Sequence, residues 1–277
     1  MAPIPQVHIF GAGIAGLATA VYCQNKGLKT KLYEAANHAG GRCRSFHDSV
    51  IDRVIDNGNH LILGGNWKIF EYLDTIGAAT KLQPVANAFS FIDLKNGERW
   101  TLRPGNAKFP FWIFFPHRRI PGTRFKDYTA LRRLPEVCPS ATLTSCVDTE
   151  STMFKRFWEP LCNAVLNTDA KEGSAKLMGR MLEHTLLRGP AFVRPFLAPE
   201  GLSATLVNPA IDYLVQCGSD IYFGERLKSI YLSETRVESL VVGDVDIACS
   251  ETDHIVLALP PHEVVALIPE LVIPTET

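Results

Sequence analysis

The sequence predicts an α/β protein in which a parallel sheet and a β-meander are interrupted by a mixed, mainly helical insertion. Three observations predict this fold. A short strand, a glycine-rich turn and a helix follow one another within residues 7–26, apolar residues recur at helical spacing between residues 125 and 217, and β-forming runs return between residues 220 and 259. We expect one domain from residues 1–85 and 200–277, and a second from residues 86–199.

Composition excludes several classes of protein. The chain has 277 residues, 46% of them hydrophobic, and a formal net charge of −1, which gives no global electrostatic case for nucleic acid. Its seven cysteines form no CxxC pair and its eight histidines show no metal-ligand spacing. No apolar run reaches the roughly 18–20 residues of a membrane span. We expect reduced thiols, no metal site, no secretory signal and a cytoplasmic protein.

The glycines after the first strand have the spacing of a dinucleotide-binding turn. Residues 7–10 predict a buried strand, and GAGIAG at residues 11–16 leads into a helix that ends at Gly27. Gly11 would permit the tight turn and Gly13 the approach of a pyrophosphate to the helix N-terminus, which attracts anions. Gly16 would allow close packing of the helix on the strand. Ala12 and Ala15 belong to the same predicted cofactor site.

An acidic residue stands where such a site binds a ribose. Residues 29–33 predict a second strand, and Glu34 follows it, eighteen residues after Gly16. Its carboxylate would accept hydrogen bonds from the ribose diol and disfavour a 2′-phosphate. We expect Ala35 to lie beside it. The arrangement predicts a Rossmann-like domain, but the turn alone does not separate NAD from FAD.

The loop after Glu34 carries a second glycine pair and a cation. Gly41 would allow close backbone approach, and Arg42 offers a planar guanidinium suited to phosphate. The alternative for Arg42 is a solvated surface arginine. Because the loop follows the ribose-binding acid directly, we expect both to face the same ligand.

Further elements follow from local patterns. Asn96-Gly97 predicts a two-residue hairpin turn, and Pro160 would kink or split its helix, which Thr149 or Ser151 would cap. We expect helices over residues 65–76, 125–134, 151–166, 174–187 and 203–217, a hairpin over 88–102, and strands over 220–223, 225–232, 236–242 and 254–259.

A basic and aromatic stretch precedes the insertion's helices. Residues 99–133 contain nine Lys or Arg and one acid, Asp127, around the run FPFWIFFP at residues 109–116. One interpretation is a core segment beneath a solvated basic face. The other is an interfacial patch over residues 109–119 that contacts the inner face of a membrane peripherally. Single-stranded nucleic acid also prefers interleaved rings and cations, but the dinucleotide turn argues against it.

Several motifs together resemble a known family. GAGIAGLATA, Glu34 and GGRCRS at residues 40–45 resemble the flavoprotein group of amine oxidases and carotenoid-type desaturases, in which GGR is selective for FAD. DNGNH at residues 56–60 resembles the squalene-associated desaturases, also called hydroxysqualene dehydroxylases. WEPL at residues 158–161, PEGLS at 199–203 and VLALPP at 256–261 agree with the same family.

The resemblance implies an FAD-binding domain with an inserted substrate domain. It implies further cofactor contacts at Gly58, Asn59, Leu227 and Leu259, where the backbone of Leu227 would meet the adenine. The implied reaction is reduction of the allylic alcohol hydroxysqualene to squalene, in hopanoid or sterol precursor synthesis. It needs a long apolar isoprenoid substrate and an unidentified reductant of the flavin.

The same resemblance suggests a proton donor. His60 is our candidate, because a histidine near the flavin could titrate near neutrality, and Asp56 could orient it. The alternatives are a hydrogen-bonded structural histidine and a turn or capping aspartate.

Other functions stay open at this point. A carotenoid-type desaturase or an amine oxidase would run hydride transfer in the opposite direction. The family continues with a glycine-containing strand–helix unit that this sequence lacks before Thr277. We therefore expect a complete ADP half of the FAD site and an incomplete flavin-ring half, and a non-catalytic FAD-binding remnant is a third possibility.

Overall fold

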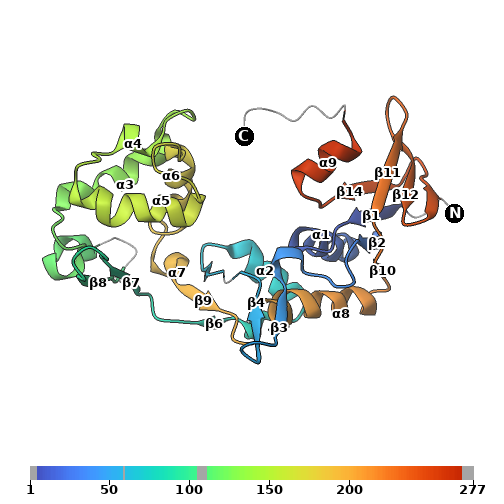
Figure 1. Ribbon diagram of the computed structural model, residues 1–277, viewed down its shortest axis with the longest axis horizontal. Coiled ribbons are helices and arrows are strands. Elements are labelled where there is room, and N and C mark those ends of the chain that lie inside the picture. Colours follow the sequence, from blue (N-terminus) through green and yellow to red (C-terminus); the bar gives the residue numbers. More distant parts are fainter. Residues whose placement is uncertain (1–4, 59, 105–110, 270–277) are drawn as a thin grey trace. The chain divides into compact units, whose positions relative to one another are not determined.

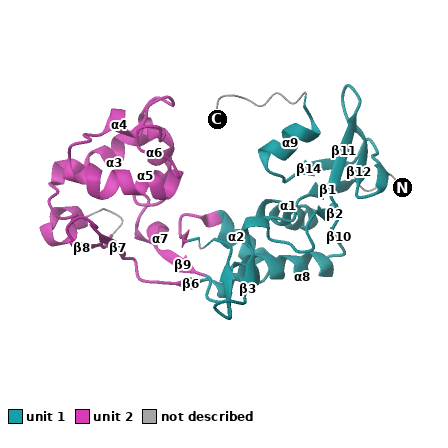
Figure 2. Cartoon of the chain, viewed as in Figure 1, with its two compact units in different colours: residues 1–60, 68–83, 198–277 teal, residues 61–67, 84–197 magenta. Residues whose placement is uncertain are grey.

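The computed structural model describes residues 5–58, 60–104 and 111–269, and it forms two compact units (Figures 1 and 2). Unit 1 comprises residues 1–60, 68–83 and 198–277, and unit 2 comprises residues 61–67 and 84–197. The predicted α/β class, with a parallel sheet and a separate meander, is confirmed. The assignment of cofactor and substrate to separate domains stays a prediction.

Unit 1 is built on a parallel sheet with the strand order β10-β2-β1-β14. In this sheet β1 pairs with both β2 and β14, and β10 pairs with β2. The carboxyl ends of β1, β2 and β14 therefore meet at one edge, where open α/β sheets bind ligands. The strands are β1 (Gln6–Phe10), β2 (Lys29–Glu34), β10 (Asp220–Phe223) and β14 (His254–Leu257).

Helices and a meander pack on this sheet (Figure 1). Helix α1 contacts β1, β2 and α8. The antiparallel meander β11-β12-β13 packs on Phe10 and Tyr33 of the sheet through Leu227, Leu240 and Val242. These elements are α1 (Ile14–Asn25), α8 (Asn208–Gln216), β11 (Leu227–Leu232), β12 (Val237–Val242) and β13 (Val245–Ala248). The sequence did not predict β13 as a separate strand.

His8 is a buried titratable group in β1. It is 3% exposed, and its Nδ1 lies 3.3 Å from the hydroxyl oxygen of Tyr33. Burial lowers the pKa of His8 below its usual value; Asp253 opposes this effect and Lys31 adds to it. The folded protein therefore resists protonation of this ring.

We expect this ring to make stability depend on pH. As the pH falls below about 6.5, the unfolded chain binds a proton that folded His8 resists, so the free energy of unfolding decreases. Urea unfolding at pH 7.5 and pH 5.5 measures the effect. His8→Gln should reduce the difference between the two pH values, whereas an unchanged difference would contradict the assignment to His8.

The rest of unit 1 consists of a β-hairpin, further helices and two 3₁₀ turns. The hairpin of β3 and β4, which the sequence did not predict, pairs Ser45 with Asp56. A π-helical turn at Ser203–Val207 precedes α8, because Pro209 offers no amide hydrogen to the first turn of that helix. The remaining elements are β3 (Ser45–Asp48), β4 (Arg53–Asp56), α2 (Trp67–Thr75), α9 (Pro261–Leu267), and the 3₁₀ turns Gly41–Cys43 and Ala79–Lys81.

Unit 2 contains short helices around an aromatic core. Trp158 is 1% exposed and packs in one cluster with Trp112, Cys162, Met178 and Leu182. The helices are α3 (Ala130–Arg133), α4 (Leu143–Cys146), α5 (Glu159–Leu166), α6 (Ala175–His184) and α7 (Pro190–Val193). The strands are β5 (Ile62–Leu63), β6 (Gln83–Pro84), β7 (Phe89–Ile92), β8 (Arg99–Leu102) and β9 (Pro195–Leu197), with the orders β5-β9-β6 and β7-β8.

Pro160 lies inside a continuous helix. The helical backbone begins at residue 152, passes through a π-helical turn, Phe154–Trp158, and continues into α5, whose first turn contains Pro160. The π-helical turn accommodates the missing amide of Pro160, so the helix is distorted but not split. Ser151 provides the cap, since its Oγ accepts a hydrogen bond from the amide of Phe154 at 3.1 Å.

The hairpin of β7 and β8 forms, but the predicted two-residue turn is wrong. Ile92 pairs with Arg99, and the amide of Asp93 donates to the carbonyl oxygen of Glu98 at 2.8 Å, which leaves a four-residue loop. Local acceptors explain the longer loop. The Asn96 side chain accepts from the amide of Glu98 at 2.9 Å, and the Asp93 carbonyl accepts from Gly97 at 2.8 Å.

Two helices differ from their predicted extents. The predicted helix over residues 125–134 is a 3₁₀ turn, Phe125–Tyr128, followed by α3 and a second 3₁₀ turn, Leu134–Glu136. Pro135 lacks the amide that would continue the helix there. The predicted helix over residues 174–187 ends at His184.

Candidate dinucleotide-binding site

The turn between β1 and α1 is held at the carboxyl edge of the sheet. The amide of Gly11 donates to the carbonyl oxygen of Tyr33 at 2.8 Å, which ties the turn to β2. Gly11 has a φ of +97°, and a Cβ at this position would lie 2.6 Å from the carbonyl oxygen of Ala258. Only glycine satisfies both the conformation and the contact.

Gly16 is required by the crossing of α1 over this turn. A Cβ at Gly16 would lie 1.8 Å from the carbonyl oxygen of Gly11 and 3.3 Å from the Cβ of Ala258. Backbone atoms of the turn cannot move far enough to relieve such a clash. The helix can therefore approach the strand end this closely only with glycine at position 16. The packing expected from the sequence is therefore present.

Gly13 differs from both, because the space beside it is open. A Cβ at Gly13 would meet no atom within 4 Å. Gly13 is the N-cap of α1, has no side chain to cap the helix, and is followed by a first turn without an acidic residue. The first amides of α1 therefore keep donor capacity for an anion, and the helix dipole favours one.

Glu34 reaches the same turn from the end of β2. Its Oε2 accepts a hydrogen bond from the amide of Ala12 at 2.7 Å, and its Oε1 accepts from the amide of Ala36 at 2.8 Å. A carboxylate has about four lone-pair positions, so two acceptor positions are left for a ribose diol. Glu34 thus joins the glycine turn to the loop that follows β2.

We expect Glu34→Gln to weaken both the turn and cofactor retention. The side-chain NH₂ of the new glutamine would face one of the two backbone amides, Ala12 or Ala36, that now donate to Glu34. The loss of that charge-assisted hydrogen bond should lower the free energy of unfolding by about 1–3 kcal/mol. Urea unfolding and retention of flavin through gel filtration measure the two effects. Glu234→Gln, an exposed site on the meander, is the matched control. Wild-type stability and retention in Glu34→Gln would contradict this role.

The loop after Glu34 lies directly against the turn. The amide of Gly40 donates to the carbonyl oxygen of Ala12 at 2.8 Å, and the Cβ position of Gly41 is 3.3 Å from the Cα of Gly13. Arg42 is exposed on the 3₁₀ turn that follows. The structure therefore brings Gly41 against Gly13, and Arg42 follows Gly41 on the same 3₁₀ turn. The contact of Arg42 with phosphate stays a prediction.

Apolar residues line the other side of the turn. Leu227 is 8% exposed and packs with Phe10 and Tyr33. Leu259 is half-buried in the same cluster, and its Cδ2 lies 3.3 Å from the Cβ position of Gly11. Both residues lie at the sheet edge where Glu34 ends β2. Ala15 and Ala35 are exposed.

Asp56 makes its hydrogen bonds within a structural network. Its Oδ1 accepts from the Ser45 hydroxyl at 2.6 Å and from the amide of Leu202 at 2.8 Å. The amide of Ser203 donates in turn to the Ser45 hydroxyl at 2.9 Å. Asp56 thereby links the β3–β4 hairpin to the helix that begins with PEGLS, which matches the capping alternative.

The proposed proton donor is not held by Asp56. Neither of these two hydrogen bonds involves His60, which is exposed. The Cβ position of Gly58 is 3.6 Å from the Nε2 of His60. Asn59 lies outside the described residues. The role of His60 stays a prediction.

Two residues that shape this site were not predicted from the sequence. Gly40 bonds the backbone of the turn, and the carbonyl of Ala258 sets the space at Gly11. The glycine pair could have suggested Gly40. Ala258 lies 247 residues after Gly11, so no local signal could have identified its contact.

The geometry fits the ADP portion of a dinucleotide. It combines open space at Gly13, free donor capacity at a helix N-terminus, an exposed arginine and an acid with spare acceptor positions. Among the described residues, no group of three His, Cys, Asp or Glu side chains could hold a metal ion. Within the same residues, no helix is long and apolar enough to span a bilayer.

Comparisons with curated proteins agree with the resemblance noted from the motifs. The hydroxysqualene dehydroxylase of Sinorhizobium fredii (strain NBRC 101917 / NGR234) is 40% identical over 271 residues, which cover 98% of this chain and 65% of that protein. The protein of the same name from Rhodopseudomonas palustris is 40% identical with the same coverage. A zeta-carotene desaturase of Synechocystis is 26% identical, covering 96% of this chain and 59% of the relative. The chain thus spans about 65% of the length of the dehydroxylases it matches.

Solved structures share the fold at low identity. An oxidoreductase from Methanosarcina mazei superposes with a TM-score of 0.72 at 14% identity, covering 98% of this chain and 62% of that one. A putrescine oxidase gives a TM-score of 0.63 at 19% identity, covering 94% and 59%. A family model described as flavin containing amine oxidoreductase matches residues 14–275. The chain therefore belongs to the flavin containing amine oxidoreductase family.

Proposed function

We propose that this protein is an FAD-dependent oxidoreductase that reduces hydroxysqualene to squalene. The observation that carries the proposal is the 40% identity, along 98% of the chain, to proteins named hydroxysqualene dehydroxylase. The dinucleotide turn in unit 1 supports the cofactor. The substrate and the reaction come to this chain from those relatives, over the 65% of their length that it matches.

The chain's own residues would hold the ADP portion of FAD. The amides at the start of α1 and the guanidinium of Arg42 would bind the pyrophosphate across the open space at Gly13. Glu34 would accept hydrogen bonds from the ribose, and its charge would disfavour NADP. The flavin-containing family and the GGR element favour FAD over NAD.

The reaction replaces a C–O bond by a C–H bond. Reduced FAD, when bound, supplies the hydride that the allylic carbon receives. The protein must orient the substrate, exclude water and deliver one proton to the departing hydroxyl oxygen, which leaves as water. His60 is the proposed donor of that proton. Asp56, through Ser45 and Leu202, would fix the hairpin from which the segment carrying His60 begins.

Substrate and reductant follow from the same chemistry. Hydroxysqualene is a long isoprenoid that dissolves in lipid, so a peripheral contact with a membrane would bring the protein to it. Each turnover oxidises the flavin, so a separate electron donor must reduce it again.

Product formation tests the proposal directly. The purified chain is loaded with FAD, reduced with dithionite and incubated with hydroxysqualene, and squalene is measured by gas chromatography. We expect squalene to form, and His60→Gln to slow it about 100-fold while retaining FAD. A flavin-loaded chain that forms no squalene would overturn the reaction.

A second candidate is desaturation or amine oxidation, which the zeta-carotene desaturase similarity and the family model favour. To test this candidate, phytoene or a simple amine is added to the oxidised flavoprotein. Desaturation or amine oxidation would reduce the flavin and bleach its yellow colour, which the proposed reduction of hydroxysqualene would not do. A third candidate is a non-catalytic remnant. A folded chain that stays colourless after incubation with FAD would favour it.

A further inference from the structure

A cluster of exposed phenylalanines lies on unit 2. Four of the five phenylalanines that are exposed in the described part of the chain fall within residues 111–125, and the fifth is Phe223. Phe114 and Phe125 stack with their ring centroids 4.8 Å apart, which joins the two segments of the cluster. We call Phe111, Phe114, Phe115 and Phe125 the aromatic patch. Rings gathered in this way mark an interaction surface.

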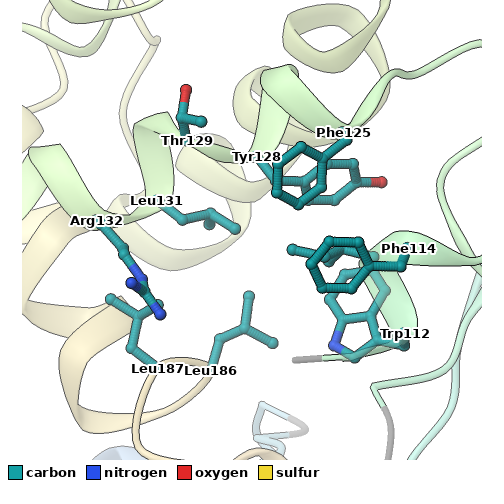
Figure 3. Close-up of a pocket in the computed structure, with 10 residues that line it drawn as sticks. Trp112, Phe114, Phe125, Tyr128, Thr129, Leu131, Arg132, Leu186 and Leu187 are labelled. Carbon is teal, nitrogen blue, oxygen red and sulfur yellow. The ribbon is translucent and has the colours of Figure 1, made fainter. Parts of the chain in front are cut away.

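The stacked pair borders an apolar cavity of about 170 Å³. Figure 3 shows Phe114 and Phe125 on one side of the cavity and Leu131, Leu186 and Leu187 toward the other. The side chain of Arg132 lies beside the two leucines (Figure 3). The patch thus continues inward as an apolar cavity that is also lined by the buried core residues Trp112, Tyr128 and Leu131.

Positive charge surrounds the patch. Residues 111–133 contain six arginines and lysines and one acid, Asp127, a net charge of +5, although the whole chain carries −1. Arg118, Arg124 and Lys126 are exposed, and within the described residues none of them forms an ion pair with an acidic side chain. Asp127 accepts a hydrogen bond from the backbone amide of Arg124 at 2.7 Å. The surface is therefore complementary to an anionic partner.

We propose that the aromatic patch and its cations dock the protein on an anionic lipid bilayer. Phenylalanine rings would enter the interfacial region, and the arginines and lysine would meet lipid phosphates. Arg118 follows the ring run at residues 111–115, and Arg124 and Lys126 flank Phe125. This order lets rings enter the interfacial region while the neighbouring cations stay at the level of the phosphates. Docking stands apart from the proposed reaction, although the same bilayer would dissolve its substrate.

Sedimentation with vesicles tests the docking. The chain is mixed with phosphatidylcholine vesicles that either contain or lack phosphatidylglycerol. We expect binding to the anionic vesicles about tenfold tighter than to the neutral ones, and a loss of this difference as salt rises. Failure to bind anionic vesicles, or equal binding to both kinds, would overturn the proposal.

Paired variants separate the two contributions. Phe115→Ser with Phe125→Ser, and Arg118→Gln with Arg124→Gln, should each weaken binding about tenfold or more. Leu177→Ser with Lys171→Gln is the matched control, because Leu177 is 55% exposed on α6, outside the patch. It should bind like the wild type.

Two further measurements keep the result interpretable. Thermal unfolding of each variant should match the wild type, which shows that the patch variants still fold. Sedimentation equilibrium without lipid measures self-association. A dimer that the patch variants abolish, together with no vesicle binding, would assign the surface to a second copy and contradict docking on a bilayer.

Discussion

Gly16→Ala is expected to unfold unit 1 or to destabilise it by about 3 kcal/mol or more, the upper range for overpacking a buried site. The added Cβ would lie 1.8 Å from the carbonyl oxygen of Gly11. That carbonyl belongs to a turn tied to β2 by the 2.8 Å hydrogen bond from Gly11 to Tyr33. Relief of the clash therefore requires α1 to move off the sheet. Urea unfolding followed by circular dichroism measures the loss.

Gly27→Ala is the matched control at the other end of the same helix. Gly27 has a φ of +75°, but its Cβ would meet nothing within 4 Å. It should cost only the left-handed strain of a non-glycine residue, about 1–2 kcal/mol. If Gly16→Ala proves no less stable than Gly27→Ala, the close crossing of α1 over the turn is contradicted.

Gly13→Ala is expected to leave folding intact and to weaken FAD binding about 10- to 100-fold. In the protein alone, the new methyl group would occupy open space, and the φ of −68° at Gly13 suits alanine. The change in unfolding free energy should stay within about 1 kcal/mol, because the loss of a glycine N-cap and the gain in chain stiffness oppose each other. The methyl group would, however, fill the space assigned to the pyrophosphate.

Fluorescence titration with FAD and thermal unfolding, run on the same preparation, measure both halves of this prediction. Normal stability with lost affinity supports the assignment. Normal stability with wild-type affinity would place the pyrophosphate elsewhere. Together with Gly16→Ala, the variant separates a glycine needed for packing from a glycine needed for the ligand.

The β1–α1–β2 unit could be predicted from the sequence because the residues that determine it follow one another along the chain. Glycine spacing fixes the turn, apolar alternation fixes the strands, and Glu34 follows at the strand end. The two π-helical turns were also partly predictable, since Pro160 indicated a distortion of the first helix. Pro209 carried the same signal for the helix predicted to begin at residue 203.

Elements that depend on tertiary contacts or on competing side chains were missed. The loop after β7 lengthens because Asp93 and Asn96 bond its backbone, which overrides the Asn-Gly turn preference. The segment around Tyr128 forms 3₁₀ turns while the hydroxyl of Tyr128 accepts the amide of Ile120 at 3.0 Å. This bond ties the segment to a residue eight positions earlier, and helical periodicity does not reveal such a contact.

In the candidate site, too, contacts between nearby residues were predictable and contacts between distant residues were not. The spacing of the glycines and the acid identified Gly11, Gly13, Gly16 and Glu34 as neighbours. The partner of Asp56 could not be identified, because the amide of Leu202 lies 146 residues further along the chain. The sequence therefore left two roles open for Asp56, orienting His60 or capping a helix. Its hydrogen bond from the amide of Leu202 matches the capping role.

Calorimetric titration of the purified chain with FAD and with NAD tests the central claim most directly. The turn around Gly13, with Glu34 and Arg42, is proposed to bind the ADP portion of FAD, which NAD also carries. We expect saturable binding of one FAD per chain, competition by excess NAD, and weaker FAD binding in Gly13→Ala. A folded chain that binds no FAD, or FAD binding that neither excess NAD nor Gly13→Ala weakens, would contradict this assignment.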